Sequence, residues 1–550
     1  MRRPFTVQDV RVDKNFRALE KKIDKFKDAM VDIRKYANFA TAISAIGAME
    51  VTLLIPNHQP ITDDAIVPTN ISTVIIKGGS LISSNSSKVI FNGYFEAGLY
   101  GVFKGSLVVE FGAGSVKKVY PEWWGIDGVA DEVEINKAIN AFPYVTLQQN
   151  KDYSIEGSIV PVSNLRLRGA GKGTKILTDT AEINLINIDD ANNVKISDLW
   201  LYGADRLDPS GYVVWVQGTS SECVIERCWI EQAWGGVLLD SGTSKNKVID
   251  NDFSTLGADD GSSGYGVLAA RSHENLIARN HFSTVKRHAV YISTEACYNI
   301  VTKNTIDGTM YEAIAMYSNA DAAQAPCLHN KIESNIIKNC QDGIMLTQRC
   351  GHSIIAGNIL ENITAKGISI EGNTHYAAMT DSPYHITIEG NNINGAVHAI
   401  KVINGSYVLI NDNTMSDISQ YGVWLTYVGA AASCYTEYCT VTNNSINGDG
   451  YAGIIHDDFS RTRHNMIRGN SIFGFTNKVS IVNVWNGDFE IPNATTQNVV
   501  GLNIAAPWGG TWRVGDIAWN TTPAAGGTPG WVCTTAGTPG TWKPMANLGA

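Results

Sequence analysis

The 550-residue sequence is poor in charge: Asp, Glu, Lys and Arg make up only 17% of it, and the formal net charge is −10. A negatively charged chain lacks the basic footprint that neutralises phosphates, so we expect no nucleic-acid partner. Hydrophobic residues make up 44%, which excludes bulk disorder and predicts a large folded core. Local positive patches can still bind an anionic polysaccharide, so the net charge does not identify a sugar ligand.

Signals for membranes, disulfides and cofactors are also missing. No stretch approaches the ~18 consecutive apolar residues of a membrane span, so no membrane insertion is expected. Met1-Arg2-Arg3 is followed by no apolar run of the kind that marks a secretory signal. No nucleotide loop, metal-ligand cluster or nucleophile elbow is present, so we expect no cofactor and no metal. The nine cysteines form no C-x-x-C spacing and are expected to be reduced, with four of them as small core side chains. These four are Cys223, Cys297, Cys340 and Cys439.

Residues 1–40 are predicted to form a helical stem. Their apolar residues recur at alternating spacings of three and four, which is the pattern of a coiled coil. The pattern is also typical of a single amphipathic helix packed on its own domain, and a helix this short is marginal in water alone. The apolar positions are Phe16, Leu19, Ile23, Phe26, Met30 and Ile33.

Residues 41–118 are predicted to be a β-rich lead-in. Short apolar runs such as Val51–Ile55 and Thr73–Ile76 alternate with Gly, Ser and Asn. This alternation is typical of short strands joined by turns. A segment of helical character follows over Asp131–Ala141.

An internal repeat runs through residues 119–485. Its unit reads Asn-x-(Ile/Phe/Leu/Met), preceded by a short apolar run and followed by (Gly/Ala)-(Val/Ile)-x-apolar, with Cys228 in the place of Asn in one unit. Successive units begin 22 to 33 residues apart, which is the period of a solenoid. The repeated residues are Asn251, Asn280, Asn304, Asn335, Asn358, Asn391, Asn413, Asn444 and Asn470.

Each unit holds strands too short to form a sheet alone. Stacked at about 4.8 Å, such strands pair in parallel, bury a continuous interior and let the Asn amides hydrogen-bond along the stack. The sequence therefore predicts an all-β fold, a right-handed single-stranded parallel β-helix, with the handedness taken from the general preference for right-handed crossovers. A leucine-rich repeat lacks its Leu framework here, and a propeller needs blades of about 40 residues.

The repeat lengths alternate between short and long, because extra residues fall at one place in the unit. Insertions on one side of a solenoid are typical of a binding wall, whereas neutral surface drift does not require the alternation. The insertions are residues 256–263, 319–326, 373–383 and 429–437.

The repeat fades after Trp485, and residues 486–550 are predicted to form a separate small β module. Covering the open end of the solenoid or clamping a trimer is the favoured role, with carbohydrate binding as the alternative. Five tryptophans lie there among Gly, Pro and Thr: Trp508, Trp512, Trp519, Trp531 and Trp542.

The run Tyr120-Pro121-Glu122-Trp123-Trp124-Gly125 resembles the segment with which bacteriophage tailspikes and related pectate-lyase-like β-helix proteins begin their helix. The usual Gly-Asp-Gly and paired Asp that follow are altered here to Ile126–Gly128 and Asp131–Glu132. The Asn-rich repeats and the tail over Gly515–Trp542 also resemble phage tail proteins.

This resemblance implies a homotrimer with an N-terminal segment that attaches to the virion. The segment is short, so we expect docking through an adaptor or baseplate protein of the phage tail. The implied ligand is a bacterial surface polysaccharide. The implied location is the virion tail, assembled in the host cytoplasm, released by lysis and active at the bacterial surface.

Hydrolysis of a glycosidic bond needs two carboxyl groups, one as acid and one as base or nucleophile. Equivalent positions of successive units stack, so carboxylates can be located by column. The column two residues before the inward Val or Ile is expected on the corner, ahead of a strand that begins at the Gly or Ala. It contains Tyr265, His288, Glu312, Asp342, Lys366, His398 and Tyr421.

Glu312 and Asp342 occupy this column in adjacent units, which predicts Cα atoms about 5 Å apart. Proximity of like charges is expected to raise the pKa of one of them, as a general acid requires. Glu371 and Glu295 are further catalytic candidates. The predicted substrate-binding residues are Tyr291, His288, Tyr317, Lys366, His398, Trp424 and Asp457.

The predicted function is endo-glycosidic hydrolysis of a capsular polysaccharide or O-antigen. Three alternatives stay open. A polysaccharide lyase needs a base such as Lys366, His288 or His398 and releases products that absorb in the ultraviolet. A non-cleaving adhesin has the aromatic surface but does not depend on the carboxylates. In the third alternative, the carboxylates have no catalytic role and are ordinary solvated corner residues.

Overall fold

The computed structural model describes residues 29–549 apart from residues 181–182, 204–210, 260, 319–324, 373–381, 429–434, 457–461, 464, 482–499, 504–505, 508–511, 513, 521 and 538. The chain divides into two compact units. One comprises residues 1–187 and 191–200, and the other residues 188–190 and 201–550. Most of the predicted N-terminal helix lies outside the described residues.

The described end of that predicted helix is not a continuous α-helix. Met30–Asp32 forms strand β1, which pairs in parallel with β2 (Val51–Ile55). Ile33–Lys35 is a 3-10 helix, and the Ile33 side chain is fully buried. Strand pairing and burial thus override the heptad pattern at Met30 and Ile33. The first described α-helix is α2 (Phe39–Ile46).

The lead-in is a three-sided coil of parallel strands, with sheet orders β1-β2-β5-β8, β3-β6-β9 and β10-β7-β4. Aromatic rings fill its interior, with centroids 4.8 Å apart for Phe91 and Phe95 and 5.1 Å for Phe95 and Trp123. The predicted strands are confirmed, but their parallel coiling was not predicted. The remaining strands of the coil are β3 (His58–Pro60), β4 (Ala65–Val67), β5 (Ile71–Ile75), β6 (Ser80–Ser83), β7 (Lys88–Phe91), β8 (Phe95–Ala97), β9 (Phe103–Gly105) and β10 (Val108–Phe111).

A short helical segment follows the lead-in. Pro121–Trp124 forms a 3-10 helix, and α3 spans Glu132–Ala141, so the predicted helix is confirmed. Asp131, fully buried, accepts the backbone N–H of Gly128 at 2.9 Å and that of Ser154 at 3.0 Å. This aspartate therefore fixes a turn. Asp131, which follows the tailspike-like run Tyr120–Gly125, thus has a structural role here.

A parallel sheet of 33 strands runs from β11 to β45. The parallel β-helix is thus confirmed. Each coil of the second unit contributes strands to three faces, and every strand pairs with its equivalent in the next coil, as Val248 pairs with Ile277 and Val267 with Val290. The strands of the sheet before these coils are β11 (Tyr144–Thr146), β12 (Lys151–Ser154), β13 (Arg166–Leu177), β14 (Ile186–Asp189) and β15 (Lys195–Tyr202).

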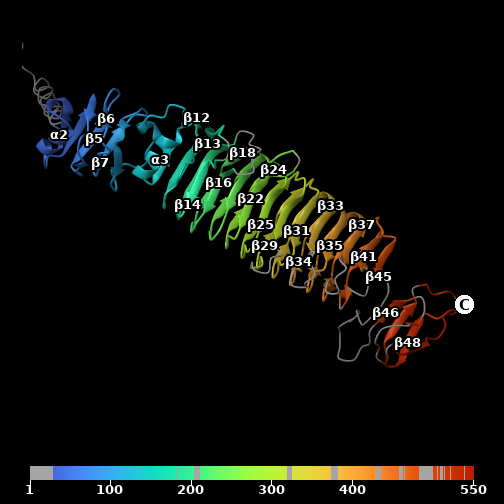
Figure 1. Cartoon of the computed structure of the whole chain (residues 1–550). Helices are drawn as coiled ribbons and strands as arrows, with labels where there is room; N and C mark the ends of the chain where they lie inside the picture. Colours follow the sequence, from blue (N-terminus) through green and yellow to red (C-terminus); the bar gives the residue numbers. More distant parts are fainter. Residues whose placement is uncertain are drawn as a thin grey trace, which may run out of the picture. The chain divides into compact units, whose positions relative to one another are not determined.

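Figure 1 shows the strands of the second unit stacked in order along the chain. The first face contains β17 (Val224–Glu226), β20 (Lys247–Ile249), β23 (Leu276–Ala278), β26 (Ile300–Thr302), β29 (Lys331–Glu333), β32 (Ile354–Ala356), β34 (Thr387–Glu389), β36 (Leu409–Asn411), β39 (Thr440–Thr442) and β43 (Met466–Arg468). The second face contains β18 (Trp229–Ala233), β21 (Asp252–Leu256), β24 (His281–Val285), β27 (Thr305–Asp307), β30 (Ile336–Lys338), β40 (Ser445–Gly448) and β44 (Ser471–Phe473).

The third face contains β16 (Tyr212–Gln217), β19 (Gly235–Leu239), β22 (Tyr265–Ala270), β25 (His288–Ser293), β28 (Glu312–Tyr317), β31 (Asp342–Thr347), β41 (Ala452–His456) and β45 (Asn477–Ile481). Three long strands contribute to both the second and the third face: β33 (Ile359–Glu371), β35 (Asn392–Ile403) and β37 (Thr414–Thr426). Two short strands, β38 (Thr436–Glu437) and β42 (Thr462–Arg463), pair with each other.

The predicted Asn ladder lies at the corner between the first and second faces. The backbone N–H of Asn304 donates to Oδ1 of Asn335 at 3.0 Å, and its Nδ2 donates to the same oxygen at 2.9 Å and to the carbonyl of Ile277 at 3.0 Å. The same three bonds recur at Asn280 and Asn358. The ladder is confirmed, and it satisfies polar groups that would otherwise be buried without partners.

A second ladder, which was not predicted, lies at the other end of the first face. The backbone N–H of Asn246 donates to Oδ1 of Asn275, that of Asn275 to Asn299 and that of Asn299 to Asn330, at 2.9 to 3.0 Å. Ser353 continues this ladder by accepting the N–H of Asn330 at 3.2 Å. Both ends of the first face are thus held by side-chain amides.

None of the eight cysteines that the structure describes forms a disulfide. Cys228, in the ladder position of its coil, donates its backbone N–H to Oδ1 of Asn251 at 2.9 Å. Among the described residues, no helix combines the length and hydropathy required to cross a membrane. The C-terminal strands β46 (Val500–Asn503), β47 (Ile517–Asn520), β48 (Gly530–Thr535) and β49 (Thr541–Pro544) form a separate four-stranded sheet.

Candidate functional site

The predicted column of polar and aromatic residues lies on the outer side of the third face. The register pairs Tyr265 with His288, Glu312 with Asp342, and His398 with Lys366 and Tyr421. The order of the column is therefore as predicted. We refer to it as the outer column.

The start of the strands differs from the prediction. Strand β31 begins at Asp342 itself and not at the Gly343 that follows it. A Cβ on Gly343 would lie 2.4 Å from Leu360 Cδ2, so no side chain fits at this position. The Asp342 carboxylate contacts the partly exposed side chain of Lys366, which places it on the outer side of the face.

Glu312 and Asp342 are the first residues of neighbouring strands, β28 and β31. Such partners have Cα atoms about 4.8 Å apart. The Glu312 side chain is only 14% exposed. Burial raises the pKa of Glu312 above its ordinary value, and the neighbouring carboxylates of Asp342 and Glu371 add to this rise. A carboxyl group in this environment is suited to hold a proton and to donate it.

Lys366 joins the other two carboxylates of the group. Its Nζ lies 3.2 Å from Asp342 Oδ2 and 2.9 Å from Glu371 Oε1, and its backbone N–H donates to Asp342 Oδ1 at 2.8 Å. Burial opposes the charge on Lys366, but the two carboxylates outweigh it and raise its pKa above the ordinary value. Both oxygens of Asp342 therefore have a donor, which holds this carboxylate in one orientation.

His288 covers the other side of Glu312. Its Nδ1 lies 3.0 Å from the carbonyl oxygen of Glu312 and 3.4 Å from Oε2 of the same residue. Burial lowers the pKa of His288 to about 4. The ring is therefore neutral at pH 7 and donates from Nδ1 to the carbonyl, since a carbonyl oxygen can only accept.

Aromatic side chains cover the outer side of the third face in the coils before Glu312. Trp234 packs against Tyr212 and Tyr265 with centroids 5.2 and 5.7 Å apart, and Tyr291 stacks on Tyr265 at 5.6 Å. Gly235 occupies the outer column between the two tyrosines, where a Cβ would lie 2.5 Å from the Tyr212 ring. The glycine therefore makes room for the ring packing.

A second aromatic group follows Lys366 in the next coils. His398 stacks on Tyr421 at 5.1 Å, and Trp424 lies 4.9 Å from both rings. Lys401 Nζ lies 4.1 Å from the centroid of the Trp424 ring. Burial, with the positive charges of Lys401 and Lys366, lowers the pKa of His398 to about 4. Within the described part of the chain, its Nδ1 has no hydrogen-bond partner.

Among the described residues, no hydrogen bond or ion pair joins the remaining predicted residues to Glu312, Asp342 or Lys366. Tyr317 ends β28 and pairs with Thr347, which in turn pairs with Glu371. Glu295 lies in the turn after β25 and accepts the backbone N–H of Ala325 at 2.8 Å, so the contacts of its carboxylate lie outside the Lys366 group. Asp457 lies outside the described residues, as do most of the predicted wall insertions.

Three groups on this face were absent from the predicted site. Tyr212 and Trp234 lie in the coils where Gly235 interrupts the outer column. The predicted column begins at Tyr265 and therefore does not include them. Arg287 lies 5.3 Å from the Tyr265 ring and precedes the column by one residue. The signal that could have found them is the gathering of Trp and Tyr in residues 212–234.

No group of three or more His, Cys, Asp or Glu residues in the described ranges is arranged to hold a metal ion. Adjacent strands of the third face bring together five titratable side chains: Glu312, Asp342, Glu371, Lys366 and His398.

The chain belongs to the right-handed β-helix family, whose model matches residues 184–336 and 331–496. No curated protein matches the sequence. Three similar solved structures are β-helix proteins. The enzymatically active domain of tailspike protein 2 from bacteriophage CBA120 shares 11% identity over 54% of this chain and 48% of that one, with a TM-score of 0.39.

The second similar structure is the catalytic unit of an α-1,3-glucanase from Streptomyces thermodiastaticus, with 16% identity, 70% of each chain covered and a TM-score of 0.45. The third is a module of a mannuronan C-5 epimerase from Azotobacter vinelandii, with 17% identity over 68% of this chain and all of that one, and a TM-score of 0.43. The chain spans about half the length of the tailspike domain that it matches. Similarities at these levels transfer no activity to this chain.

Proposed function

We propose that the chain is a phage tailspike enzyme that binds a bacterial capsular polysaccharide or O-antigen and hydrolyses it at internal glycosidic bonds. The observation that carries the proposal is the pair Glu312 and Asp342. They start adjacent strands, Glu312 has a raised pKa, and Asp342 is held by two donors from Lys366. Two carboxyl groups in different environments are what glycoside hydrolysis requires.

In this proposal Glu312 protonates the leaving oxygen. Asp342 acts on the other side of the bond, either attacking the sugar carbon or activating a water. Lys366 is a positioning residue, since it orients Asp342 and Glu371. The Cα atoms of adjacent strands are about 4.8 Å apart, so we infer a carboxyl separation nearer the ~5–5.5 Å of retaining enzymes than the wider one of inverting enzymes. The first sugar released is therefore expected to keep its anomeric configuration.

The anomer released by the first cleavage distinguishes two choices of base. Proton NMR of fresh product is expected to show retention if Asp342 attacks the sugar. Inversion would indicate that a more distant carboxylate such as Glu371 activates a water, and would remove Asp342 from the role of nucleophile.

The two aromatic groups extend the proposal to the substrate. The group around Tyr265 and Tyr291 and the group around Tyr421 and Trp424 lie in coils on either side of the carboxylates. Ring faces and amphipathic tyrosines stack well on sugars. A chain bound by both groups would pass over Glu312 at an internal bond, which is the reason for proposing endo-cleavage.

A polysaccharide lyase is the second candidate, favoured by one observation. His398 has a neutral ring and an Nδ1 without a partner in the described residues, one strand from Lys366. A neutral imidazole can remove the proton next to a uronate carboxylate. Lys366 is a poor base, because its raised pKa keeps it charged.

The proposal also includes the assembly. We expect a homotrimer attached to the phage tail through residues 1–40, directly or through an adaptor, with residues 119–485 binding and cutting the glycan and residues 486–550 capping the solenoid or clamping the trimer. Deleting residues 1–36 is expected to prevent incorporation into virions without loss of cleavage. Sedimentation of the purified protein tests the trimer.

The test of the function is incubation of the purified protein with surface polysaccharides from a panel of bacteria, with products analysed by mass and ultraviolet absorbance. Saturated oligosaccharides of the repeating unit are expected. Products with an absorbing double bond would establish the lyase. Binding of the host polysaccharide without cleavage would leave an adhesin and would overturn the roles of Glu312 and Asp342.

A further inference from the structure

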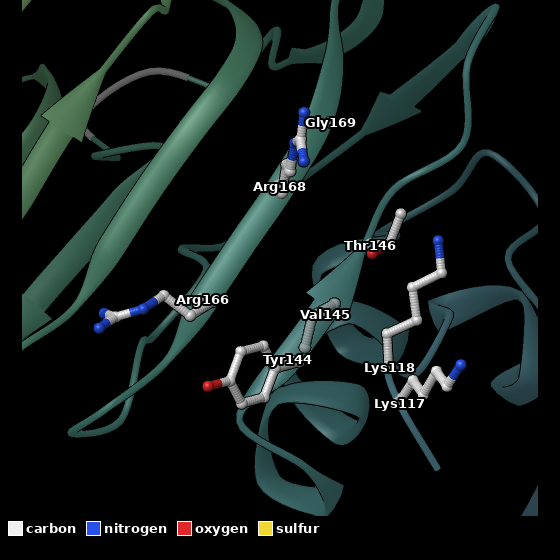
Figure 2. Close-up of a pocket in the computed structure, with 8 residues that line it drawn as sticks. All are labelled: Lys117, Lys118, Tyr144, Val145, Thr146, Arg166, Arg168 and Gly169. Carbon is white, nitrogen blue, oxygen red and sulfur yellow. The ribbon is translucent and has the colours of Figure 1, made fainter.

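A basic hollow lies in the first unit, which also contains the lead-in. Its volume is about 370 Å³. Its walls come from the segment before Val119, from β11 and from β13, as Figure 2 shows. The residues that line it are Lys117, Lys118, Tyr144, Val145, Thr146, Arg166, Arg168 and Gly169. Four of these eight are cationic in a chain whose net charge is −10.

Three residues of the hollow form a short column of their own. Val119 pairs in parallel with Val145, so Lys118 and Tyr144, which precede them, are neighbours. Tyr144 pairs with Arg166 on β13. An aromatic ring therefore lies between two cations in strand order, at steps of about 4.8 Å.

Most of the positive charge of the hollow is not neutralised. Among the described residues, the ion-pair partner of this group is Asp198, whose Oδ2 lies 3.0 Å from Arg168 Nε. Arg166 donates instead to the carbonyl oxygen of Asn193 at 2.8 Å, and Lys118 Nζ lies 5.1 Å from the centroid of the Tyr120 ring. Both contacts leave the positive charge in place, so the hollow favours an anion.

The shape of the hollow favours several anionic groups on one ligand. In Figure 2 the lysine side chains and the Arg166 side chain point in different directions. A single small ion cannot contact such divergent groups, whereas an oligosaccharide with a charge on each repeat can. Tyr144 is 52% exposed, so its ring is available to stack on a sugar face.

We infer that this hollow is a second glycan site, which binds an acidic saccharide with a sugar ring on Tyr144 and carboxylates beside Lys118 and Arg166. The site contains none of the residues proposed for cleavage. It would hold an acidic polysaccharide that the third face does not itself cut, or another stretch of the same glycan.

The experiment is a calorimetric titration of the full-length protein with oligogalacturonate, with a neutral maltooligosaccharide of equal length as the control ligand. The acidic probe is expected to bind and the neutral one not to. The variant Lys118→Glu/Arg166→Glu is expected to bind oligogalacturonate about tenfold more weakly, because charge-assisted contacts are lost. Lys104→Glu, an exposed change on β9 outside the hollow, is the matched control and is expected to bind normally.

Two further titrations distinguish a saccharide site from a simple anion site. Tyr144→Ala is expected to weaken oligogalacturonate binding, whereas inorganic phosphate is expected to bind weakly to both forms. Equal affinity for phosphate and for the saccharide would reduce the hollow to a simple anion site, and unchanged binding in the double variant would overturn the site altogether. Binding of oligogalacturonate and cleavage of the host polysaccharide are measured separately, so the failure of this inference and the failure of the cleavage proposal can be distinguished.

Discussion

Two positions in the same coils of the β-helix differ in their residues: one is the same from coil to coil, and the other changes. At the ladder corner the residue is Asn in coil after coil, and each amide makes the same bonds to the next coil. In the outer column the backbone is equally regular, but the residue changes from Tyr to His, Glu, Asp, Lys and His again. The repeated Asn stabilises the fold, and the variable column contains the residues for which we propose catalytic roles.

The physical reason lies in what each position faces. A ladder Asn is buried and must satisfy the same backbone groups in every coil, so one side chain meets the requirement each time. The residues of the outer column pack against different neighbours from one coil to the next, such as Trp234 at Tyr265 and Lys366 at Asp342, so no single side chain is required at every step. A cluster such as Glu312, Asp342 and Lys366 is tolerated there because the stack beneath it supports the backbone independently.

The largest expected effect comes from changing the two carboxylates. Glu312→Gln and Asp342→Asn are each expected to lower kcat on the cleaved polysaccharide by about 10³-fold, because each removes an acid or base group. The melting temperature is expected to stay close to that of wild type, since the ladders are intact. Initial rates and thermal melts of both variants check this. Full activity in either variant would exclude the changed residue from the reaction.

At the ladder we expect a loss of stability. Asn335→Ala removes the acceptor of two bonds from Asn304 and the donor of two more, to Val301 and Asn358. We expect the free energy of unfolding to fall by about 2–4 kcal/mol, because buried partners are left unsatisfied. Lys331→Ala, an exposed change on β29 of the same coil, is the control and is expected to have little effect. Urea unfolding measures both.

Much of this comparison was visible in the sequence. The repeated Asn predicted the ladder, and counting two residues back from the Val or Ile that follows the Gly or Ala of each unit placed Glu312 and Asp342 in one column. The second ladder carries the same signal, since Asn246, Asn275 and Asn299 each precede a ladder Asn by five residues. The contact between Lys366 and Glu371 could not be predicted, because it depends on how two long side chains orient above the strand.

The parallel coiling of the lead-in could not be predicted from the sequence. Its parallel strands carry no repeated corner residue, so the sequence predicted strands and turns without their coiling. Its interior is organised by Phe and Trp rings that pack irregularly, with interplanar angles from 20° to 69° among Phe91, Phe95, Phe111 and Trp123. Aromatic packing of this kind fills space without a fixed spacing in sequence.

A moderate effect is expected from the aromatic group beyond the carboxylates. Trp424→Ala is expected to raise KM about fivefold with less change in kcat, because a stacking surface of about 1 kcal/mol is lost. Tyr298→Ala is the matched control: this exposed ring stacks on His329 at 4.9 Å, outside the third face. Steady-state kinetics on the cleaved polysaccharide compare the two. Equal KM values would remove Trp424 from the binding surface.

The last expected effect concerns pH. Burial lowers the pKa of His288, His398 and His456 to about 4 from 6.5. The unfolded chain therefore binds more protons than the folded chain between these values, so the free energy of unfolding falls as pH drops from 6.5 towards 4. Urea unfolding at several pH values measures the slope. A stability independent of pH over this range would contradict the burial of neutral rings.

The central claim is that Glu312 acts as the proton donor. The most direct test is the pH dependence of kcat for wild type and for Glu312→Gln on the cleaved polysaccharide. In wild type the rate is expected to fall as pH rises through the raised pKa of Glu312, and the residual activity of Glu312→Gln is expected to lack this alkaline limb. An alkaline limb that persists unchanged in Glu312→Gln would assign the proton to another residue and contradict the account.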